Sequence, residues 1–208
     1  VEAKDTVLSD EEKGKFIQYP VEGYATDSDG LCQAQAEVSF KAGIKELISL
    51  GHLVPLKALA VQVDISLRDV STHDGDYSQK PLADVWECEN LYDLVVACHQ
   101  RYAGDRPAMA FTVSVEGARR LAERFNAAGI TAASADGQTA TSDRAAILTD
   151  FRAGRTRVLC NCQLWTEGLD LPSIACVHMA RPTQSDLVYV QAIGRGLRPA
   201  PGKSDCLV

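Results

Sequence analysis

Two arginines and a glutamine near the C-terminus have the spacing of an anion-binding surface. The stretch Gln191 to Pro199 reads Gln-Ala-Ile-Gly-Arg-Gly-Leu-Arg-Pro. On a helix, Gln191, Arg195 and Arg198 stand at i, i+4 and i+7 and therefore share one face. Guanidinium groups donate in a planar fork, stay charged at any working pH and match the oxygens of a phosphate. The pattern favours a phosphate-binding face, and its alternative is a solvated helix end, where the helix dipole favours cations.

The charges of this acidic chain are unevenly distributed. The net charge is −7, yet residues 1–100 carry 8 Lys and Arg against 18 Asp and Glu, whereas residues 101–208 carry 13 against 10. Twelve of those thirteen cations are arginines, which indicates local anion sites rather than a basic coating. No apolar run approaches the ~20 residues that span a bilayer. We expect a cytoplasmic protein without a membrane partner and, since it begins at Val1, a fragment.

The cysteines and histidines suggest core packing rather than metal chemistry. The seven cysteines are an odd number and lie mostly inside apolar runs, as expected of reduced thiols in a cytosol. Cys160 and Cys162 are separated by one residue, which is poor zinc spacing, and no second pair completes a site. His178 stands in the apolar run 175–179 without an evident acid–base partner. We therefore predict no metal site and interpret His178 as a core histidine.

The C-terminal half alternates strands with helices. Apolar strands are expected at 107–113, 130–134, 157–161, 175–180 and 205–208. The intervening helices are expected at 114–128, from a Ser142 cap to Gly154, and from a Ser185 cap through Gln191. Uniformly apolar strands that alternate with amphipathic helices predict an α/β fold of three layers, a parallel sheet with helices on both faces.

The N-terminal half is less regular. Residues 1–32 are polar and are interpreted as a linker or irregular appendage. Residues 33–104 are predicted to form a lead-in of helix, strand and helix before the main domain, residues 105–208. Its elements are a helix from Gln33 to Leu50 that Gly51 ends, a strand at 53–65, a polar loop at 68–79 and a helix within 77–102 that ends near Gly104.

The chemistry of such a sheet belongs at one edge, because ligands bind at the carboxyl ends of parallel strands. Three polar segments follow predicted strands directly: 112–114, 161–170 and 181–185. The sequence contains no Gly-x-x-x-x-Gly-Lys-Ser/Thr loop, and no Asp-Glu pair follows an apolar strand in this half. The chain therefore has an edge suited to contacting phosphate but lacks the loop that would bind it, so the sequence predicts only half of a nucleotide site.

Taken together, these stretches resemble a known family. Residues 105–208 resemble the second, RecA-like domain of superfamily 2 helicases, the DEAD/DEAH-box-like ATPases of the DNA-repair and restriction type. Ala110 to Ser114 is similar to motif IV and Thr166 to Pro172 to motif V. Gln191 to Arg198 is similar to motif VI, with the pattern Gln-x-x-Gly-Arg-x-x-Arg. Residues 33–104 resemble the lead-in that such helicases carry between their two domains.

The resemblance implies a role for each matching residue. Arg195 and Arg198 would be arginine fingers that reach the γ-phosphate of ATP, and Gln191 would contact that phosphate or the attacking water. Gly168, Asp170 and Gly194 would lie at the nucleotide, while Thr112, Ser114 and Thr166 would touch the nucleic-acid backbone. ATP and Mg²⁺ would be held mainly by the protein's own N-terminal RecA-like domain, expected upstream of Val1, so this chain alone is predicted to hydrolyse no ATP.

Several alternatives stay open at this point. Asp170 would bind ribose or orient the arginines of motif VI, or it would only cap a turn before Leu171. Thr112 and Ser114 could instead close a strand and cap the next helix. DNA is the expected substrate, because RNA-directed DEAD-box proteins more often have His at the position of Gln191, but backbone contacts leave RNA open. The competing functions are a non-catalytic nucleic-acid-binding module and the motor part of a restriction enzyme.

Overall fold

The computed structural model describes residues 43–87, 89–162 and 170–208, and the chain divides into two compact units. In the unit Leu8–Leu53, the described helix is α1 (Ile44–Ser49). Gly51 follows it with a φ of +75° and donates its N–H to Ile48 O at 3.0 Å. A left-handed glycine just past the helix is a common termination, so the predicted stop is confirmed. Residues 33–42 of the predicted helix lie outside the described residues.

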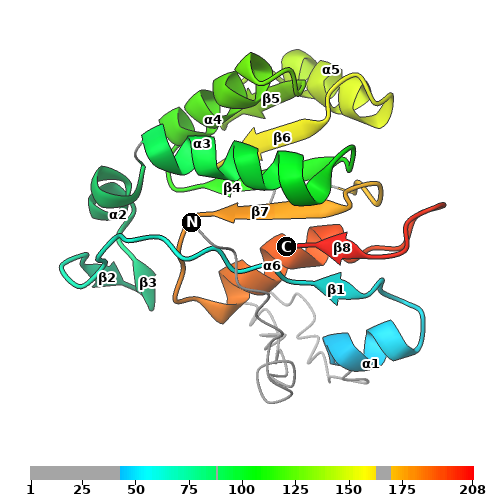
Figure 1. Cartoon of the computed structure of the whole chain (residues 1–208), viewed down its shortest axis with the longest axis horizontal. Helices are drawn as coiled ribbons and strands as arrows, with labels where there is room; N and C mark the ends of the chain where they lie inside the picture. The colour runs from blue at the N-terminus through cyan, green and yellow to red at the C-terminus, as the bar shows by residue number, and fades with distance from the viewer. Residues whose placement is uncertain (1–42, 88, 163–169) are drawn as a thin grey trace, which may run out of the picture. The chain divides into compact units, whose positions relative to one another are not determined.

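A six-stranded parallel sheet forms the centre of the unit Val54–Val208 (Figure 1). Its strands are β1 (Leu56–Lys57), β4 (Ala108–Thr112), β5 (Ala132–Ala135), β6 (Val158–Asn161), β7 (Cys176–Ala180) and β8 (Cys206–Leu207). They lie in the order β1-β8-β7-β4-β6-β5, and every neighbouring pair is parallel. All residues of β4 and β6 are buried. The predicted parallel sheet with uniformly apolar central strands is confirmed.

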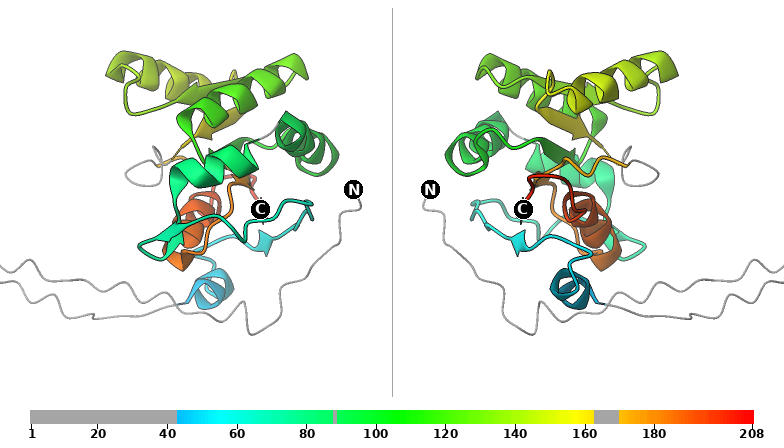
Figure 2. Two further views of the ribbon diagram at one scale, coloured as in Figure 1. Left: turned by 90° about the vertical axis from the view of Figure 1, so that its left-hand side faces the viewer. Right: turned by 90° about the vertical axis from the view of Figure 1, so that its right-hand side faces the viewer.

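Helices cover both faces of this sheet. They are α3 (Glu89–Cys98), its π-helical continuation η2 (His99–Ala103), α4 (Val115–Ala127), α5 (Thr141–Arg152) and α6 (Asp186–Gly196). Figure 2 shows α3 and α6 on opposite sides of the strands. Among the described residues, no helix combines the length and the apolar character that a membrane span requires. The three-layer α/β architecture expected from the sequence is therefore present.

The two faces pack differently. On one face, apolar residues of α3, α4 and the central strands form a single core, including Tyr92, Leu121, Phe125 and Val158. On the other face, a Cβ added to Gly196 of α6 would lie 2.3 Å from Cys206 Sγ and 2.8 Å from a methyl group of Val177. Glycine thus allows α6 to approach β7 and β8 closely, which fixes the depth at which this helix lies on the sheet.

The lead-in contains more structure at the sheet edge than the sequence indicated. The predicted polar loop at 68–79 forms the hairpin of β2 (Thr72–His73) and β3 (Asp76–Tyr77). Asp74 and Gly75 connect the strands with φ values of 51° and 80°, the conformation that favours Asp-Gly in two-residue hairpins. Helix α2 (Gln79–Trp86) follows. Figure 1 shows the hairpin and α2 beyond the arrowheads of β4, β6 and β7.

Three predicted elements are corrected by the structure. The strand at 53–65 is reduced to β1, because its partner β8 is itself only two residues long and the last bond of that pairing runs from Leu59 N to Val208 O. The helix predicted within 77–102 is interrupted at Glu87, whose carboxylate accepts the N–H of Ser114. Ser142 does not cap α5, which begins at Thr141 after a turn closed by Asp136.

Candidate functional site

The carboxyl ends of β7, β4 and β6 lie next to one another, as the sequence predicted. Thr112 is paired with Ala180, and Phe111 is paired with Asn161. The segments that follow these strands therefore begin at one edge of the sheet. Residues 163–169 lie outside the described residues, so the predicted site residues Thr166 and Gly168 are not placed.

Helix α6 carries the glutamine and the first arginine of the predicted phosphate-binding face. Ser185 caps this helix, because its hydroxyl accepts the N–H of Val188 at 3.3 Å, which confirms the predicted start. Gln191, Gly194 and Arg195 are partly exposed, whereas their neighbours Ala192, Ile193 and Gly196 are buried. The helix thus buries one side on the sheet and presents the polar residues of the motif on the other.

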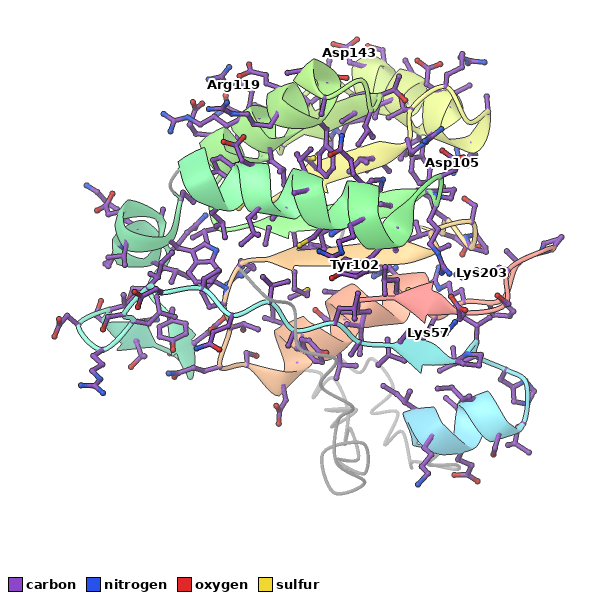
Figure 3. The ribbon with its side chains drawn as sticks, viewed as in Figure 1. Lys57, Tyr102, Asp105, Arg119, Asp143 and Lys203 are labelled. Atoms are coloured by element: carbon purple, nitrogen blue, oxygen red, sulfur yellow. The ribbon has the colours of Figure 1, made fainter. Side chains whose placement is uncertain are left out.

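Arg198 lies just beyond α6 rather than on it. The helix ends at Gly196 with Leu197 as its C-cap, two residues earlier than the sequence indicated. Leu197 is fully buried, and its carbonyl oxygen accepts the N–H of Val54 at 2.9 Å. Lys203, labelled in Figure 3, donates to the carbonyl oxygen of Arg198 at 2.7 Å. A proline also disfavours the helical conformation of the residue before it, here Arg198. The packing of Leu197 and the presence of Pro199 therefore both end the helix early.

Asp170 and Arg198 form an ion pair. Arg198 Nη1 lies 2.5 Å from Asp170 Oδ1, and the two side chains are 37% and 76% exposed. Exposed ion pairs contribute about 0–1 kcal/mol, so a ligand could replace either partner at little cost. Of the three roles open to Asp170, orientation of a motif VI arginine is the one this contact supports. The chain places the ends of motifs V and VI side by side.

The hydroxyl groups of motif IV have partners inside the protein. The Thr112 side chain is fully buried, and its Oγ1 donates to Ser114 O at 2.9 Å. Ser114 Oγ accepts the N–H of Gly117 at 2.9 Å and so caps α4. The Glu87 carboxylate accepts both the N–H of Ser114, at 2.7 Å, and its hydroxyl. These contacts support the strand-closing and helix-capping alternatives for Thr112 and Ser114.

Helix α2, which precedes the central strands in the sequence, covers this same edge of the sheet. Gln79 Nε2 donates to Val113 O at 2.8 Å, and Trp86 Nε1 donates to Ala180 O at 3.1 Å. Both acceptors lie at or just past the ends of strands, on β4 and β7. Helix α2 is therefore attached across the carboxyl ends of two strands, where the sequence predicted only polar loops.

Asp76 connects the hairpin to the loop that leads into α6, and the sequence did not reveal it. Its Oδ2 accepts from Arg181 Nη2 at 3.1 Å and from Thr183 Oγ1 at 2.8 Å, and its Oδ1 accepts the N–H of Gln184 at 2.8 Å. Thr183 Oγ1 in turn accepts the N–H of Ser185, the α6 cap. Burial opposes ionisation of Asp76, but these hydrogen bonds and the Arg181 charge together lower its pKa. The hairpin thus fixes the start of α6.

Comparison with protein families decides what this arrangement is. A family described as "Helicase conserved C-terminal domain" matches residues 87–200, more than half of the chain. The chain belongs to the helicase C-terminal domain family. The resemblance to the C-terminal RecA-like domain of superfamily 2 helicases is thereby confirmed.

Named relatives agree with this assignment. The helicase C-terminal domain is 28% identical over 195 residues to "Putative ATP-dependent helicase IRC3" of Saccharomyces cerevisiae, covering 90% of this chain and 28% of the yeast protein. It is 30% identical over 203 residues to "Putative mitochondrial ATP-dependent helicase irc3" of Schizosaccharomyces pombe, covering 96% of this chain and 33% of that protein. The chain therefore spans about a third of the length of these relatives.

A solved structure shares the fold. The "ATP-dependent Type ISP restriction-modification enzyme LlaBIII bound to DNA" superimposes with a TM-score of 0.56 at 22% identity, covering 81% of this chain and 12% of that enzyme. At this level of identity the similarity concerns the fold of the helicase C-terminal domain.

Proposed function

We propose that this helicase C-terminal domain works with an ATP-binding RecA-like domain in a DNA helicase or translocase and supplies the arginines for ATP hydrolysis. The observation that carries the proposal is the polar end of α6, where Gln191 and Arg195 are partly exposed and Arg198 follows the helix in an ion pair with Asp170. Two guanidinium groups at one helix end suit the outer phosphate of a nucleotide. The two yeast relatives carry the words "ATP-dependent helicase" in their names.

The residues of this chain fit the phosphates of ATP better than its metal. Arg195, Arg198 and Gln191 are donors that can neutralise and orient phosphoryl oxygens. Mg²⁺ binds carboxylates together with substrate phosphates, and Asp170, a carboxylate that lies at this face, is paired with Arg198. We therefore assign Mg²⁺ and the main nucleotide-binding site to the partner domain. Gly168 and Gly194 of this chain would line the edge that faces the nucleotide.

In this proposal the arginines act only when the two domains close. Transfer of the γ-phosphoryl group needs positioning and charge neutralisation more than covalent chemistry, and arginine fingers contribute about 10³–10⁵ in rate. Arg195 and Arg198 would hold developing negative charge, and Gln191 would orient the attacking water or the phosphate. Because they come from a separate domain, closure couples hydrolysis to movement along the nucleic acid.

Nucleic-acid contacts are the second part of the proposal. Thr166 would contact the nucleic-acid backbone, whereas Ser114 and the buried hydroxyl of Thr112 would act by capping α4 and by holding the strand end in place. DNA is the proposed polynucleotide because of the glutamine at position 191.

Binding to labelled oligonucleotides tests this part directly. We expect the isolated chain to bind single-stranded DNA in fluorescence anisotropy at low salt, with an affinity that falls as salt is raised, because phosphate contacts release counterions. RNA of the same sequence should bind more weakly. Equal or tighter binding to RNA would reverse the substrate assignment, and no binding to either would remove the nucleic-acid role of this domain.

ATP turnover separates the motor from a non-catalytic binding module. We expect no hydrolysis by the chain alone, and hydrolysis stimulated by DNA when it is joined to the ATP-binding domain. A binding module would hold DNA with the same affinity with or without nucleotide in the joined protein. A motor would show an affinity that changes with the nucleotide state.

A further inference from the structure

Two histidines and one cysteine converge inside the core, away from the edge described above. His99 Nδ1 lies 2.9 Å from His178 Nε2, and Cys176 Sγ lies 3.5 Å from the same nitrogen. One ligand atom from each residue lies within 4.8 Å of the others. His178 was interpreted from the sequence as a core histidine without a partner. The partner is His99, 79 residues earlier in the chain.

Small residues lie beside these side chains on the neighbouring strand. Cys176 and His178 alternate on β7 and point to the face covered by α3 and α4, and the residues paired with them on β4 are the small Ala108 and Ala110. The ring of Phe125 closes the cluster, with its centroid 5.3 Å from that of His99 in an edge-on arrangement. The result is a polar cluster in apolar surroundings, a costly arrangement unless its groups are hydrogen-bonded or bind a ligand.

His99 begins the π-helical turn η2 at the end of α3. Such turns are rare and occur frequently at functional sites, where the altered winding repositions a side chain. The His99 side chain is fully buried, and its second ring nitrogen, Nε2, has no hydrogen-bond partner among the described residues. The turn therefore places the His99 imidazole in the core, where only Nδ1 takes part in a hydrogen bond within the described part of the chain.

The protonation states suit a metal ligand. Burial, together with the neighbouring His99, lowers the pKa of His178 to about 3, and burial is also the main cause of the lowered pKa of His99. Both imidazoles are therefore neutral at physiological pH, the form that binds metals. Burial raises the pKa of the Cys176 thiol to about 12, so the thiol keeps its proton until a cation displaces it.

Two of the separations in the cluster are close to those of a zinc site. With Zn–N bonds of about 2.0–2.1 Å and a Zn–S bond of about 2.3 Å, neighbouring ligand atoms in a tetrahedron lie about 3.4 Å apart for two nitrogens and about 3.6 Å for nitrogen and sulfur. The separation of Cys176 Sγ from His178 Nε2 already matches, and the two histidine nitrogens need to separate by about half an ångström. Two imidazoles and a thiolate prefer Zn²⁺ to Mg²⁺ or Ca²⁺.

We propose that His99, Cys176 and His178 form a stabilising Zn²⁺ site that connects η2 to β7. A water molecule would complete the tetrahedron, as in zinc sites with three protein ligands. Binding displaces one proton, from Cys176 Sγ to solvent, as the Zn–S bond forms. The site stabilises the fold because the metal binds the folded state preferentially. It is independent of the nucleotide and nucleic-acid roles proposed above.

Cobalt substitution tests the site on this chain, purified without a polyhistidine tag and stripped with a chelator. We expect one equivalent of Co²⁺ to give visible bands of a tetrahedral ion together with a thiolate-to-cobalt charge-transfer band, and Zn²⁺ to abolish both. Zn²⁺ should also raise the melting temperature. The charge-transfer band separates this site from the histidines at positions 52 and 73, which have no part in the cluster.

Two cysteine variants make the test specific. Cys176→Ala should lose the charge-transfer band and weaken Zn²⁺ binding by more than about 100-fold, the upper end of what losing a group that only supports a ligand costs. Cys206→Ala removes another buried thiol of the same sheet and should keep both. Absence of the band in folded wild-type protein, or its retention in Cys176→Ala, would overturn the proposal. The wild-type titration decides the matter even if Cys176→Ala does not fold.

Discussion

The carboxylate of Asp76 positions the start of α6, the helix that carries Gln191 and Arg195, without contacting those two residues. It binds Arg181, Thr183 and Gln184, and through Thr183 it is connected to the cap of α6. The Arg181 side chain is 6% exposed, and its Nε and Nη1 have no hydrogen-bond partner in the part of the chain that the structure describes. The bond to Asp76 therefore carries most of the compensation for burying this guanidinium.

Replacing Asp76 by Asn should consequently destabilise the fold. Breaking a buried ion pair leaves an uncompensated charge and costs about 3–5 kcal/mol, which urea unfolding would measure. Asp150→Asn is the matched control, since its ion pair with Arg155 is largely exposed and should cost about 0–1 kcal/mol. Equal losses in the two variants would contradict the role assigned to Asp76.

Residue types alone could not reveal this pair. Asp76 stood in a stretch that read as a polar loop, and Arg181 stood in the short segment before α6. Their separation of 105 residues leaves no local periodicity to detect. Ser185, in contrast, was recognisable as a cap because the hydroxyl, the helix start and the bonded N–H of Val188 lie within four residues.

At the scale of elements, α6 shows two glycines with opposite requirements. Gly194 has open space where a Cβ would stand, whereas a Cβ on Gly196 would meet Cys206 and Val177. The sequence could place this helix and its start, but it put the end two residues too far, because close packing on β7 and β8 cannot be read from spacing.

Alanine at these two positions should therefore have opposite effects. Gly196→Ala is expected to lose about 1–3 kcal/mol through overpacking. Gly194→Ala is expected to gain up to about 1 kcal/mol from helix propensity. Thermal or urea unfolding of both variants would measure the difference, and a stabilised Gly196→Ala variant would show that α6 does not lie as close to the sheet as described.

The contact between η2 and β7 should make stability depend on pH. His99 and His178 have pKa values below that of an unfolded histidine, so below about pH 6.5 the unfolded chain binds protons that the folded chain does not. The contribution of the two neutral histidines to the free energy of unfolding is then fully present above about pH 6.5 and is lost as the pH decreases toward about 3. Each histidine contributes a slope of up to about 1.4 kcal/mol per pH unit.

Urea unfolding between pH 8 and pH 5, with a chelator present, measures this slope. Replacement of the exposed His73 should leave the slope of stability against pH unchanged. His178→Ala should reduce this slope. A wild-type stability that is constant over this range would contradict the neutral state of His99 and His178.

At the scale of the whole molecule, the sequence predicted the parallel sheet, its carboxyl edge and the motifs that stand there. These follow from local apolar patterns and from motif order, both of which are readable along the chain. It did not predict that 70–87 would cover that edge, because the contacts of Gln79 and Trp86 are with main-chain oxygens, which any sequence supplies.

The role proposed for Arg195 and Arg198 is tested by turnover of ATP in the protein that joins this chain to its ATP-binding domain. Arg195→Ala and Arg198→Ala should each raise the barrier to hydrolysis by about 2–4 kcal/mol, seen as a lower kcat with nearly unchanged ATP affinity. Replacing Arg152, an exposed arginine at the end of α5, by Ala should leave kcat unchanged. Wild-type kcat in both Arg195→Ala and Arg198→Ala would show that these arginines take no part in hydrolysis.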